Sequence, residues 1–431
     1  MTTPAEAAET VIRDVIADYT SGTHRAVVVD SPPGAGKSTL VVRAARQIAA
    51  TGDPLMIVAQ TNEQVNDLIS RLATADPGLA VGRLSASGYQ PPPLPPNVTV
   101  STKAADLTGC PVIVATADKW AYVSDQTWPW GIVDEAYQMR SDKLLRVAPL
   151  FERALFVGDP GQLDPFSVVD GDRWAGLSWD PMQSAVAVMS RLNPEVPVHR
   201  LPVSWRLPAS AAPLVSEAFY PFTGFQSGTA ATDRRLVLTT AGFPIALDQT
   251  LQEAAATGWA LHELPSRHTI RTDAQAVQAC AALAHRLLER GAVAYDEKGS
   301  HPVTPDRIAI GCAHRDQAAA IRAAGAPAGV TVDNANRLQG REYDVTIVLH
   351  PLSGRRDATE FHLEAGRLCV LTSRHRHACV VVARAGIPEL LDAHPSTGGV
   401  QLNVPVKFPD GWEANQAVLA HLSKHRVQAY S

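Results

Sequence analysis

The chain has 431 residues, of which 45% are hydrophobic and 19% charged, a balance that excludes disorder throughout and allows two or three domains with apolar cores. Its formal net charge of -5 gives no overall basic signature, so any contact with nucleic acid must come from a local groove. The five cysteines are scattered and form no CxxC pair, which indicates free thiols in a reducing cytoplasm and argues against a structural metal. We expect neither a signal peptide nor a membrane span, because the first twenty residues are acidic and no run approaches 18 apolar residues.

A glycine-rich segment follows the first predicted strand. Residues 5–20 have helical spacing, residues 26–29 predict a buried strand, and the string SPPGAGKST at 31–39 leads into a helix that continues over 40–50. Glycines at 34 and 36 allow main-chain N–H groups to turn toward a phosphate, and Lys37 can reach the β- and γ-phosphates. Ser31 stands where the Walker A pattern has glycine. The alternative is an ordinary Gly/Pro turn.

Short apolar runs recur along the chain and predict parallel strands covered on both faces. These runs are 55–59, 111–115, 131–133 and 154–157, and later 307–312, 344–350 and 378–383. Their rhythm predicts an α/β fold with two doubly wound, parallel-sheet domains, in which ligands gather at the carboxyl ends of the strands. We place the domains at residues 1–200 and 201–431. The first has a short proline-rich insert near 77–110, residues 205–300 have no regular pattern, and 412–427 predicts a closing helix.

Two polar strings follow predicted strands of the first domain. In WGIVDEAYQ, Asp134 ends the strand and suits a Mg²⁺ ligand, whereas Glu135 suits a general base that acts on water. In FVGDPGQLDP, the amide of Gln162 could hydrogen-bond a γ-phosphate or the attacking water. A type I turn built from Asp159 to Gly161 explains the second string equally well.

The order of these strings resembles the superfamily 1 helicases, and within them the Upf-type branch with its DEAxQ motif II. QTNEQVNDL, at 60–68, looks like motif Ia, and GDPGQLDP looks like motif III. LPVSWRLP, at 201–208, followed by Phe219 and Tyr220, resembles the stretch with a Tyr-Arg-Met core and a Phe-Tyr pair. Residues 331–345 resemble motif V and residues 366–382 motif VI. The resemblance covers most of the chain and implies two RecA-like P-loop domains with an ATP site in the cleft between them.

The resemblance also implies roles for individual residues. The SPPGAGKST segment and the strand that ends at Asp134 would bind the ATP phosphates and Mg²⁺. Glu135 would be the base and Gln162 the γ-phosphate sensor. Arg206 and Arg374 would be arginine fingers from the second domain. The remaining residues implied in nucleotide binding are Gly34, Ala35, Gly36, Lys37, Ser38, Thr39, Gly340 and Glu342, with Ser38 and Asp134 as metal ligands. Thr61, Asn62 and Thr116 would contact the backbone of single-stranded DNA or RNA.

The resemblance implies an ATP-hydrolysing motor that translocates on or unwinds nucleic acid, with 5′ to 3′ polarity. The alternative is an ATPase switch that clamps nucleic acid without unwinding it, as a subunit of a larger assembly. A small-molecule kinase would transfer phosphate to an acceptor instead of releasing it. We find no glutamine before the phosphate loop where relatives read adenine, and no accessory domain, so the chain could depend on a protein partner. The choice between DNA and RNA stays open.

Overall fold

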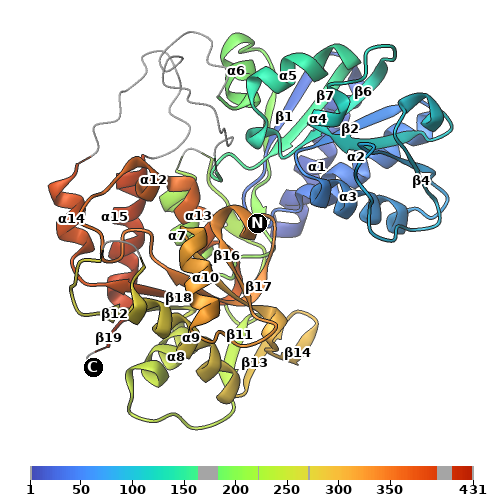
Figure 1. The fold of residues 1–431 in the computed structure, drawn as a ribbon. Helices are drawn as coiled ribbons and strands as arrows, with labels where there is room; N and C mark the ends of the chain where they lie inside the picture. The colour runs from blue at the N-terminus through green and yellow to red at the C-terminus, as the bar shows by residue number, and fades with distance from the viewer. Residues whose placement is uncertain (1, 164–182, 222, 270–271, 396–409, 430–431) are drawn as a thin grey trace. The chain divides into compact units, whose positions relative to one another are not determined.

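The computed structural model describes residues 2–163, 183–221, 223–269, 272–395 and 410–429 (Figure 1). It divides into two compact units, which we treat separately. The first unit comprises Met1–Pro160 and Asp164–Pro202, and the second comprises Gly161–Leu163 and Val203–Ser431. Among the described residues, no helix combines the length and the apolar character that a membrane crossing needs.

In the described residues, the first unit is built on an eight-stranded sheet whose strand pairs are all parallel. The strands follow the order β4-β3-β5-β2-β6-β7-β1-β8. Their bounds are β1 Ala26–Asp30, β2 Leu55–Ala59, β3 Val81–Leu84, β4 Val98–Ser101, β5 Val112–Thr116, β6 Trp128–Asp134, β7 Phe151–Gly158 and β8 Val198–Arg200. The central strands are continuous apolar runs because both faces of a parallel sheet are covered by helices.

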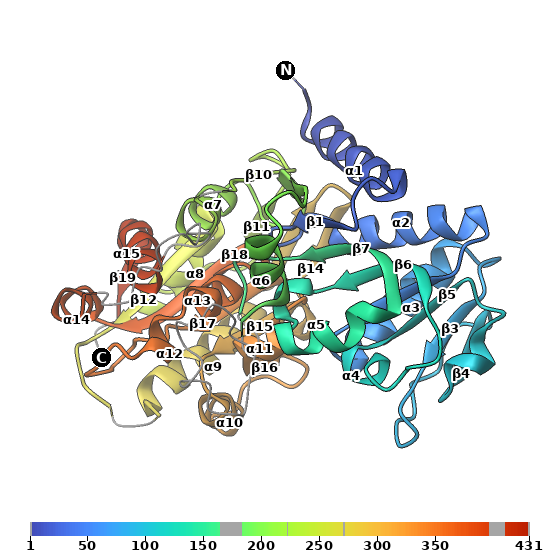
Figure 2. The ribbon, with the colours of Figure 1, turned by 90° about the horizontal axis from the view of Figure 1, so that it is seen from above.

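One face of this sheet packs against three amphipathic helices, which share a core with alternate residues of the strands (Figure 2). These helices are α1 Pro4–Ser21, α2 Lys37–Thr51 and α3 Asn62–Ala75. The unit also contains the shorter helices α4 Ala117–Trp120, α5 Ser141–Val147 and α6 Ala185–Leu192. Since successive strands connect through helices, the carboxyl ends of β1, β2, β5 and β6 meet at one edge of the sheet.

The described part of the second unit contains a six-stranded parallel sheet in the order β16-β15-β17-β18-β12-β19. Its strands are β12 Trp259–Leu264, β15 Ile308–Cys312, β16 Thr331–Asn334, β17 Tyr343–Leu349, β18 His375–Arg384 and β19 Arg426–Gln428. Two small sheets accompany it, formed by β9 Val203–Ser204 with β10 Gln226–Ser227, and by β11 Arg235–Leu238, β13 Ala292–Asp296 and β14 Gly299–Pro302.

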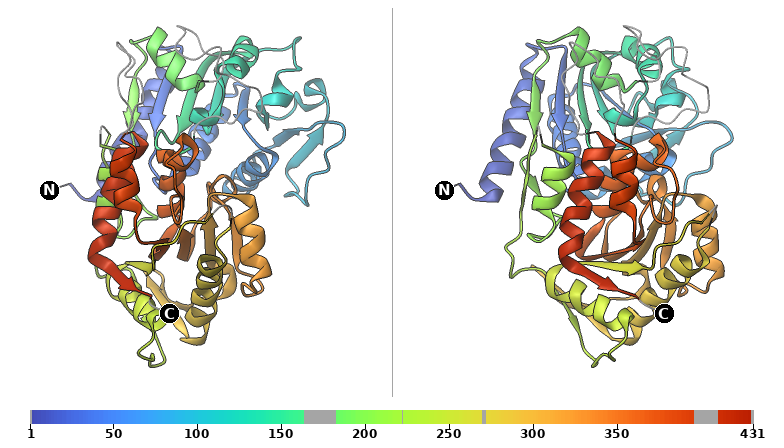
Figure 3. Two further views of the ribbon diagram at one scale, coloured as in Figure 1. Left: turned by 60° about the vertical axis from the view of Figure 1, so that its left-hand side comes forward. Right: turned by 90° about the vertical axis from the view of Figure 1, so that its left-hand side faces the viewer.

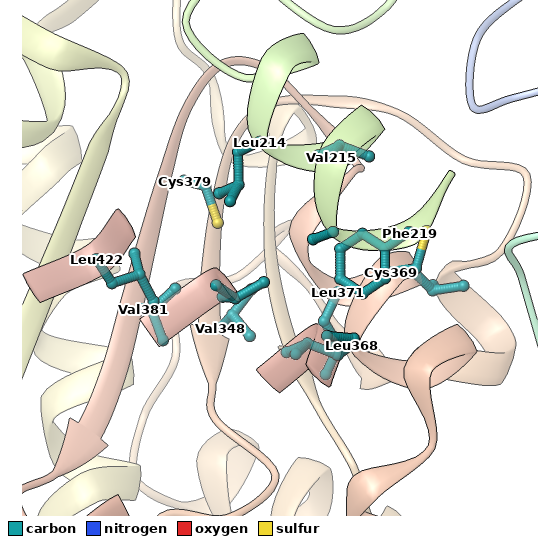
Figure 4. Close-up of a cluster of buried hydrophobic side chains, with 14 of the residues drawn as sticks. Leu214, Val215, Phe219, Val348, Leu368, Cys369, Leu371, Cys379, Val381 and Leu422 are labelled. Carbon is teal, nitrogen blue, oxygen red and sulfur yellow. The ribbon is translucent and has the colours of Figure 1, made fainter. Parts of the chain in front are cut away.

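Helices cover both faces of the second sheet (Figure 3). One face packs against α7 Ala212–Phe219, α13 Ala365–Thr372, α14 Ile387–Ala393 and α15 Gly411–Leu422, and Figure 4 shows side chains of α7 over β17 and β18. The other face packs against α8 Ala246–Thr257, α9 Ala274–Glu289 and α10 Arg315–Ala323. Short helices α11 Ala335–Leu338 and α12 Glu360–Leu363 lie in connections.

The predicted fold class, α/β with parallel sheets in two RecA-like domains, is confirmed. The apolar runs at 55–59 and 307–312 correspond to β2 and β15. The closing helix predicted over 412–427 is too long. Helix α15 ends at Leu422, and the chain then forms β19, which pairs in parallel with β12. The region 205–300, which shows no regular pattern in sequence, contains α8, β12 and α9.

Candidate functional site

The loop between β1 and α2 has a backbone that requires glycine at two positions. Gly34 has φ 73° and Gly36 has φ 89°, both in the left-handed region. Gly36 is the N-cap of α2, and no side chain caps this helix. The N–H groups of its first turn therefore have no helical partner and remain available to an anion. Ser31, the departure from the Walker A pattern, is buried and donates its N–H to the carbonyl of Gly158 at 2.8 Å, which ties the loop to β7.

Lys37, Asp134 and Glu135 meet beside this loop. The Lys37 ammonium forms a hydrogen-bonded ion pair with Glu135 Oε1. Both carboxylates are 7% exposed, so the site removes two acids and one base from bulk water. Buried charges of this kind must be paired or must bind an ion. The ion pair satisfies Lys37 and one oxygen of Glu135, whereas Oδ1 of Asp134 has no hydrogen-bond partner in the described part of the chain.

The backbone at Glu135 directs its side chain. Glu135 has φ 51° and is the residue other than glycine that adopts positive φ within the described ranges. Its Oε2 accepts from Gln138 Nε2 at 3.1 Å, and Gln60 Nε2 donates to the carbonyl of Asp134 at 3.3 Å. The following turn packs on β7, where a Cβ at Gly158 would lie 2.9 Å from the ring of Tyr137. The carboxylate is thus placed by an uncommon main-chain conformation held by its neighbours.

The pKa values at the site follow from burial and from these neighbours. Burial raises the pKa of Asp134 to about 6, against the attraction of Lys37 and with the repulsion of Glu135. Burial alone would lower the pKa of Lys37, but the charges of Glu135 and Asp134 outweigh it and raise that pKa. The lysine therefore stays a cation, and Asp134 is a carboxylate that would gain from a further positive charge.

The donor set fits a magnesium triphosphate. Mg²⁺ is held in proteins by one or two carboxylates with substrate phosphates and water, and Asp134 Oδ1 is a buried oxygen that lacks a partner among the described residues. Ser38 follows Lys37 in the first turn of α2 and is half-buried, while Thr39 is exposed. Within the described ranges, no cluster of three or more His, Cys, Asp or Glu could hold a metal ion by itself. A metal here would need ligands from a bound nucleotide.

The residues predicted to contact a polynucleotide lie at the carboxyl ends of β2 and β5. Thr61 Oγ1 caps α3 by accepting from the N–H of Gln64 at 3.3 Å, and Thr116 Oγ1 caps α4 by accepting from Lys119 at 3.2 Å. Their hydroxyls thus have a structural role that the sequence analysis did not assign. Asn62 Oδ1 accepts from Arg83 Nη2 at 3.1 Å. The polymer-binding role of these residues stays a prediction.

The other predicted nucleotide residues belong to the second unit. Arg206 Nε and Arg376 Nη1 both bond to the Glu342 carboxylate at 3.1 Å. Burial opposes ionisation of Glu342, but the two arginines outweigh it and lower its pKa. Arg374 is fully buried and donates to Ser373 Oγ at 2.7 Å. Gly340 is exposed with φ 78°.

Gln162 also groups with the second unit, as part of Gly161–Leu163. A Cβ at Gly161 would lie 2.5 Å from Tyr220, and a Cβ at Gly366 would lie 2.7 Å from the carbonyl of Gln162. This segment therefore packs tightly on residues that follow α7 and begin α13. The first unit brings together the loop, Lys37, Asp134 and Glu135, while the sensor and the arginines predicted from sequence lie in the second unit.

Several residues of these sites were not predicted from the sequence. Gln60 and Gln138 donate hydrogen bonds that orient the acid pair, and Arg83 donates a hydrogen bond to Asn62. Arg83 could have been noticed in the sequence, because a charged residue inside the short apolar run 81–84 needs buried hydrogen-bond partners.

An all-parallel sheet, a glycine loop that opens α2 and an acid pair at the end of a nearby strand define the first unit as a P-loop nucleotide-binding domain. The sequence model of the AAA domain family matches residues 13–185, less than half of the chain. No curated protein matches the sequence.

Solved structures with a similar chain path include viral helicases. A PRRSV helicase is 14% identical, with 87% of this chain and 54% of that chain covered and a TM-score of 0.44. The arterivirus nonstructural protein 10 helicase is 13% identical, with 87% of this chain and 61% of that chain covered and a TM-score of 0.45. The structure of an arterivirus nonstructural protein 10 helicase with DNA is also 13% identical, with 87% of this chain and 63% of that chain covered and a TM-score of 0.44. The chain thus spans between about half and two thirds of the length of these proteins. Similarity at this level assigns no activity to the chain.

Proposed function

We propose that the protein is an ATP-hydrolysing motor that binds single-stranded nucleic acid and translocates on it or unwinds it, as a superfamily 1 helicase of the Upf type with a DEAxQ motif II. The observation that carries the proposal is the acid pair beside the phosphate loop. Lys37 is paired with Glu135, and Asp134 presents an oxygen with no partner among the described residues. The motifs Ia, III, V and VI that follow in the sequence favour a motor over a kinase.

The chemistry assigned to the first unit is hydrolysis of the γ-phosphate. The N–H groups of the loop and the first turn of α2 bind the phosphates, and Lys37 leaves Glu135 to neutralise them. Glu135 then accepts the proton of the attacking water at a carboxylate oxygen. Asp134 and Ser38 would hold Mg²⁺, which when bound offsets negative charge on the phosphate oxygens.

The second domain, proposed to comprise residues 201–431, would supply the two arginines, and Gln162, which groups with the second unit, would be the sensor. Arg206 is held by its hydrogen bond to Glu342, and the main chain of Gln162 packs closely on Gly366, which supports roles that need a fixed position. Arg374→Ala should lower kcat by roughly 10³-fold and change the KM for ATP far less. Arg374→Lys, which keeps the charge and loses the planar fork, should recover little. Since Arg374 is fully buried, both variants need an unfolding curve, and unchanged kcat in a folded variant would reassign the residue.

The proposed function is tested by the rate of phosphate release from ATP, with and without matched DNA and RNA oligonucleotides. Stimulation by one of them, followed by strand separation on a 5′-tailed duplex, is the result expected for a motor. Stimulation without separation or translocation would support the clamp instead, and no stimulation by either polymer would remove both. Comparing ATP with GTP tests base selectivity, since the sequence has no glutamine before the loop at the place where relatives read adenine.

A further inference from the structure

A buried arginine beneath the carboxyl edge of the first sheet has no acidic partner. Arg83 lies in β3, is fully buried, and donates to three neutral oxygens. These are Asn66 Oδ1 at 2.9 Å, Asn62 Oδ1 at 3.1 Å and Ser85 Oγ. No carboxylate contributes to the pKa of Arg83, which burial lowers. A guanidinium remains protonated in proteins, so a full positive charge lies at this edge without a counter-ion in the described ranges.

Arg83 fixes the direction of the hydrogen bonds around it. Because a guanidinium can only donate, the amide oxygens of Asn62 and Asn66 must face it, and their NH₂ groups must face elsewhere. Asn66 Nδ2 donates to the hydroxyl oxygen of Tyr89 at 3.0 Å, which leaves the Tyr89 proton to be donated. Asn62 Nδ2 has no acceptor in the described part of the chain. The network therefore ends in donors on the side away from Arg83.

These donors follow nearby strands at the carboxyl edge of the sheet, beside the residues predicted to contact a polynucleotide. Asn62 follows β2 and Ser85 follows β3, and in the sheet order β5 lies between them with Thr116 at its end. Tyr89 is half-buried in the loop after β3, with its ring 4.6 Å from the Arg83 guanidinium, so the arginine also holds this loop. A buried cation with outward donors and no acceptor is complementary to a phosphodiester, which offers only acceptors and negative charge.

We propose that Arg83 is a positioning residue for the sugar-phosphate backbone of single-stranded nucleic acid, which it attracts with its charge and presents to the Asn62 amide and the Tyr89 hydroxyl. This inference rests on the proposed function and adds a residue outside the motif strings of the sequence. Arg83 itself touches no ligand, because its side chain is covered. It acts by orienting Asn62 and Tyr89 and by lowering the free energy of a bound phosphate.

The test compares binding of a labelled oligothymidylate and oligouridylate to the full chain across a series of potassium chloride concentrations. Asn62→Asp keeps an oxygen toward Arg83, so the variant should fold. The new carboxylate neutralises the charge of Arg83 and replaces the outward amide donor with an acceptor. The affinity for the oligonucleotide should therefore fall at least about tenfold. Arg83→Met should lose as much and reduce the salt slope by about 0.7, the value for one phosphate on a single strand. Arg83→Lys should keep the slope while affinity falls. Arg13→Met, which removes an exposed charge of α1, is the matched control.

The outcomes separate this inference from the proposed function. If the wild-type protein binds neither polymer, the proposed function and this inference are both wrong. Wild-type protein that binds, with an Asn62→Asp variant of equal affinity and salt slope, overturns the inference alone. A third outcome is that inorganic phosphate competes with the oligonucleotide, that its binding depends on Arg83 to the same extent, and that affinity does not increase with oligonucleotide length. This outcome would identify a site for free anions and would also overturn the inference. A urea unfolding curve for every variant checks that the fold is intact.

Discussion

Clusters of buried charge in the two units differ in whether their charged groups are paired within the fold. In the second unit, two clusters of buried charge are closed, which means that their charged groups pair with one another. Arg384 forms two hydrogen bonds with Asp273 and further bonds to Gln275 and the carbonyl of Pro265, and Asp248 accepts from Arg286, Arg290 and a main-chain N–H. In the first unit, Asp134 keeps an oxygen without a partner in the described ranges, and Arg83 has only neutral acceptors.

The difference separates structural charge from charge available to a ligand. A closed cluster stabilises one packing arrangement, and its desolvation cost is offset within the fold. An open cluster leaves part of that cost in place until an ion or a charged ligand arrives, and it is expected at sites that bind one. We therefore expect substitutions in an open cluster to lower activity and substitutions in a closed cluster to lower stability.

The largest effect is expected at the open cluster beside the phosphate loop. Lys37→Ala should remove hydrolysis, and Glu135→Gln should lower kcat by about 10³-fold because an amide cannot accept the water proton. The Glu135→Gln variant should still bind nucleotide. Phosphate release and nucleotide titration measure the two quantities. Asp14→Asn, an exposed acid on α1, serves as the control. Wild-type turnover in Glu135→Gln would remove the assignment of the base.

Breaking the closed Arg384 cluster should affect stability. Asp273→Ala leaves a buried guanidinium unpaired and removes the N-cap of α9, at a cost of about 3–5 kcal/mol in the free energy of unfolding. Urea unfolding measures this cost, and Asp392→Ala on the exposed side of α14 provides a comparison that should change little. A loss below about 1 kcal/mol would show that this closed cluster contributes little net stability.

A pH titration sharpens the comparison at Asp344 of β17. Burial would raise the pKa of this carboxyl, but His377 and His301 hold the ionised form and lower its pKa to about 2. A depressed carboxyl pKa stabilises the fold fully above the unfolded value near 4, and this contribution is lost as pH falls from about 4 to 2. Asp344→Asn should therefore cost about 2 kcal/mol at neutral pH, and the difference should shrink below about pH 4. A difference that is constant between about pH 5 and pH 2 would contradict the assignment.

The smallest effect is expected at a residue with two proposed roles. Thr61→Ala removes the cap of α3 and should cost about 1 kcal/mol of stability, whereas Thr61→Ser should keep it. If the hydroxyl also grips the polymer, Thr61→Ala loses oligonucleotide affinity as well. Equal affinity of the alanine and serine variants would assign Thr61 to capping alone.

The central strands and the loop were predictable from sequence because each depends on a local pattern. Runs such as 55–59 are apolar throughout, and the SPPGAGKST string has the spacing of a phosphate loop. The acid pair was predicted to lie near Lys37 because it ends a strand of the same parallel sheet. The fold class could therefore be predicted, because it depends on short-range features of the sequence that tertiary contacts do not override.

The features missed depend on contacts between distant residues. Strand β19 follows α15 without a turn signal that separates it from the helix, and its place beside β12 is fixed by pairing across the sheet. Strand β12 carries His262, buried against Thr250, which breaks the apolar pattern. The helix-capping roles of Thr61 and Thr116, like the direction that Arg83 gives to Asn62, appear only once the hydrogen bonds are known.

The left-handed backbone at Glu135 has a consequence for timing. A residue with a Cβ disfavours this conformation by roughly 1–2 kcal/mol, and that free energy is expended when the chain folds, before any ligand arrives. The carboxylate then needs no rearrangement of its main chain at each turnover, because Gln138 and the turn over Gly158 already restrain it. If Glu135 is the base, its main-chain conformation is therefore set when the chain folds and does not have to form again in each catalytic cycle.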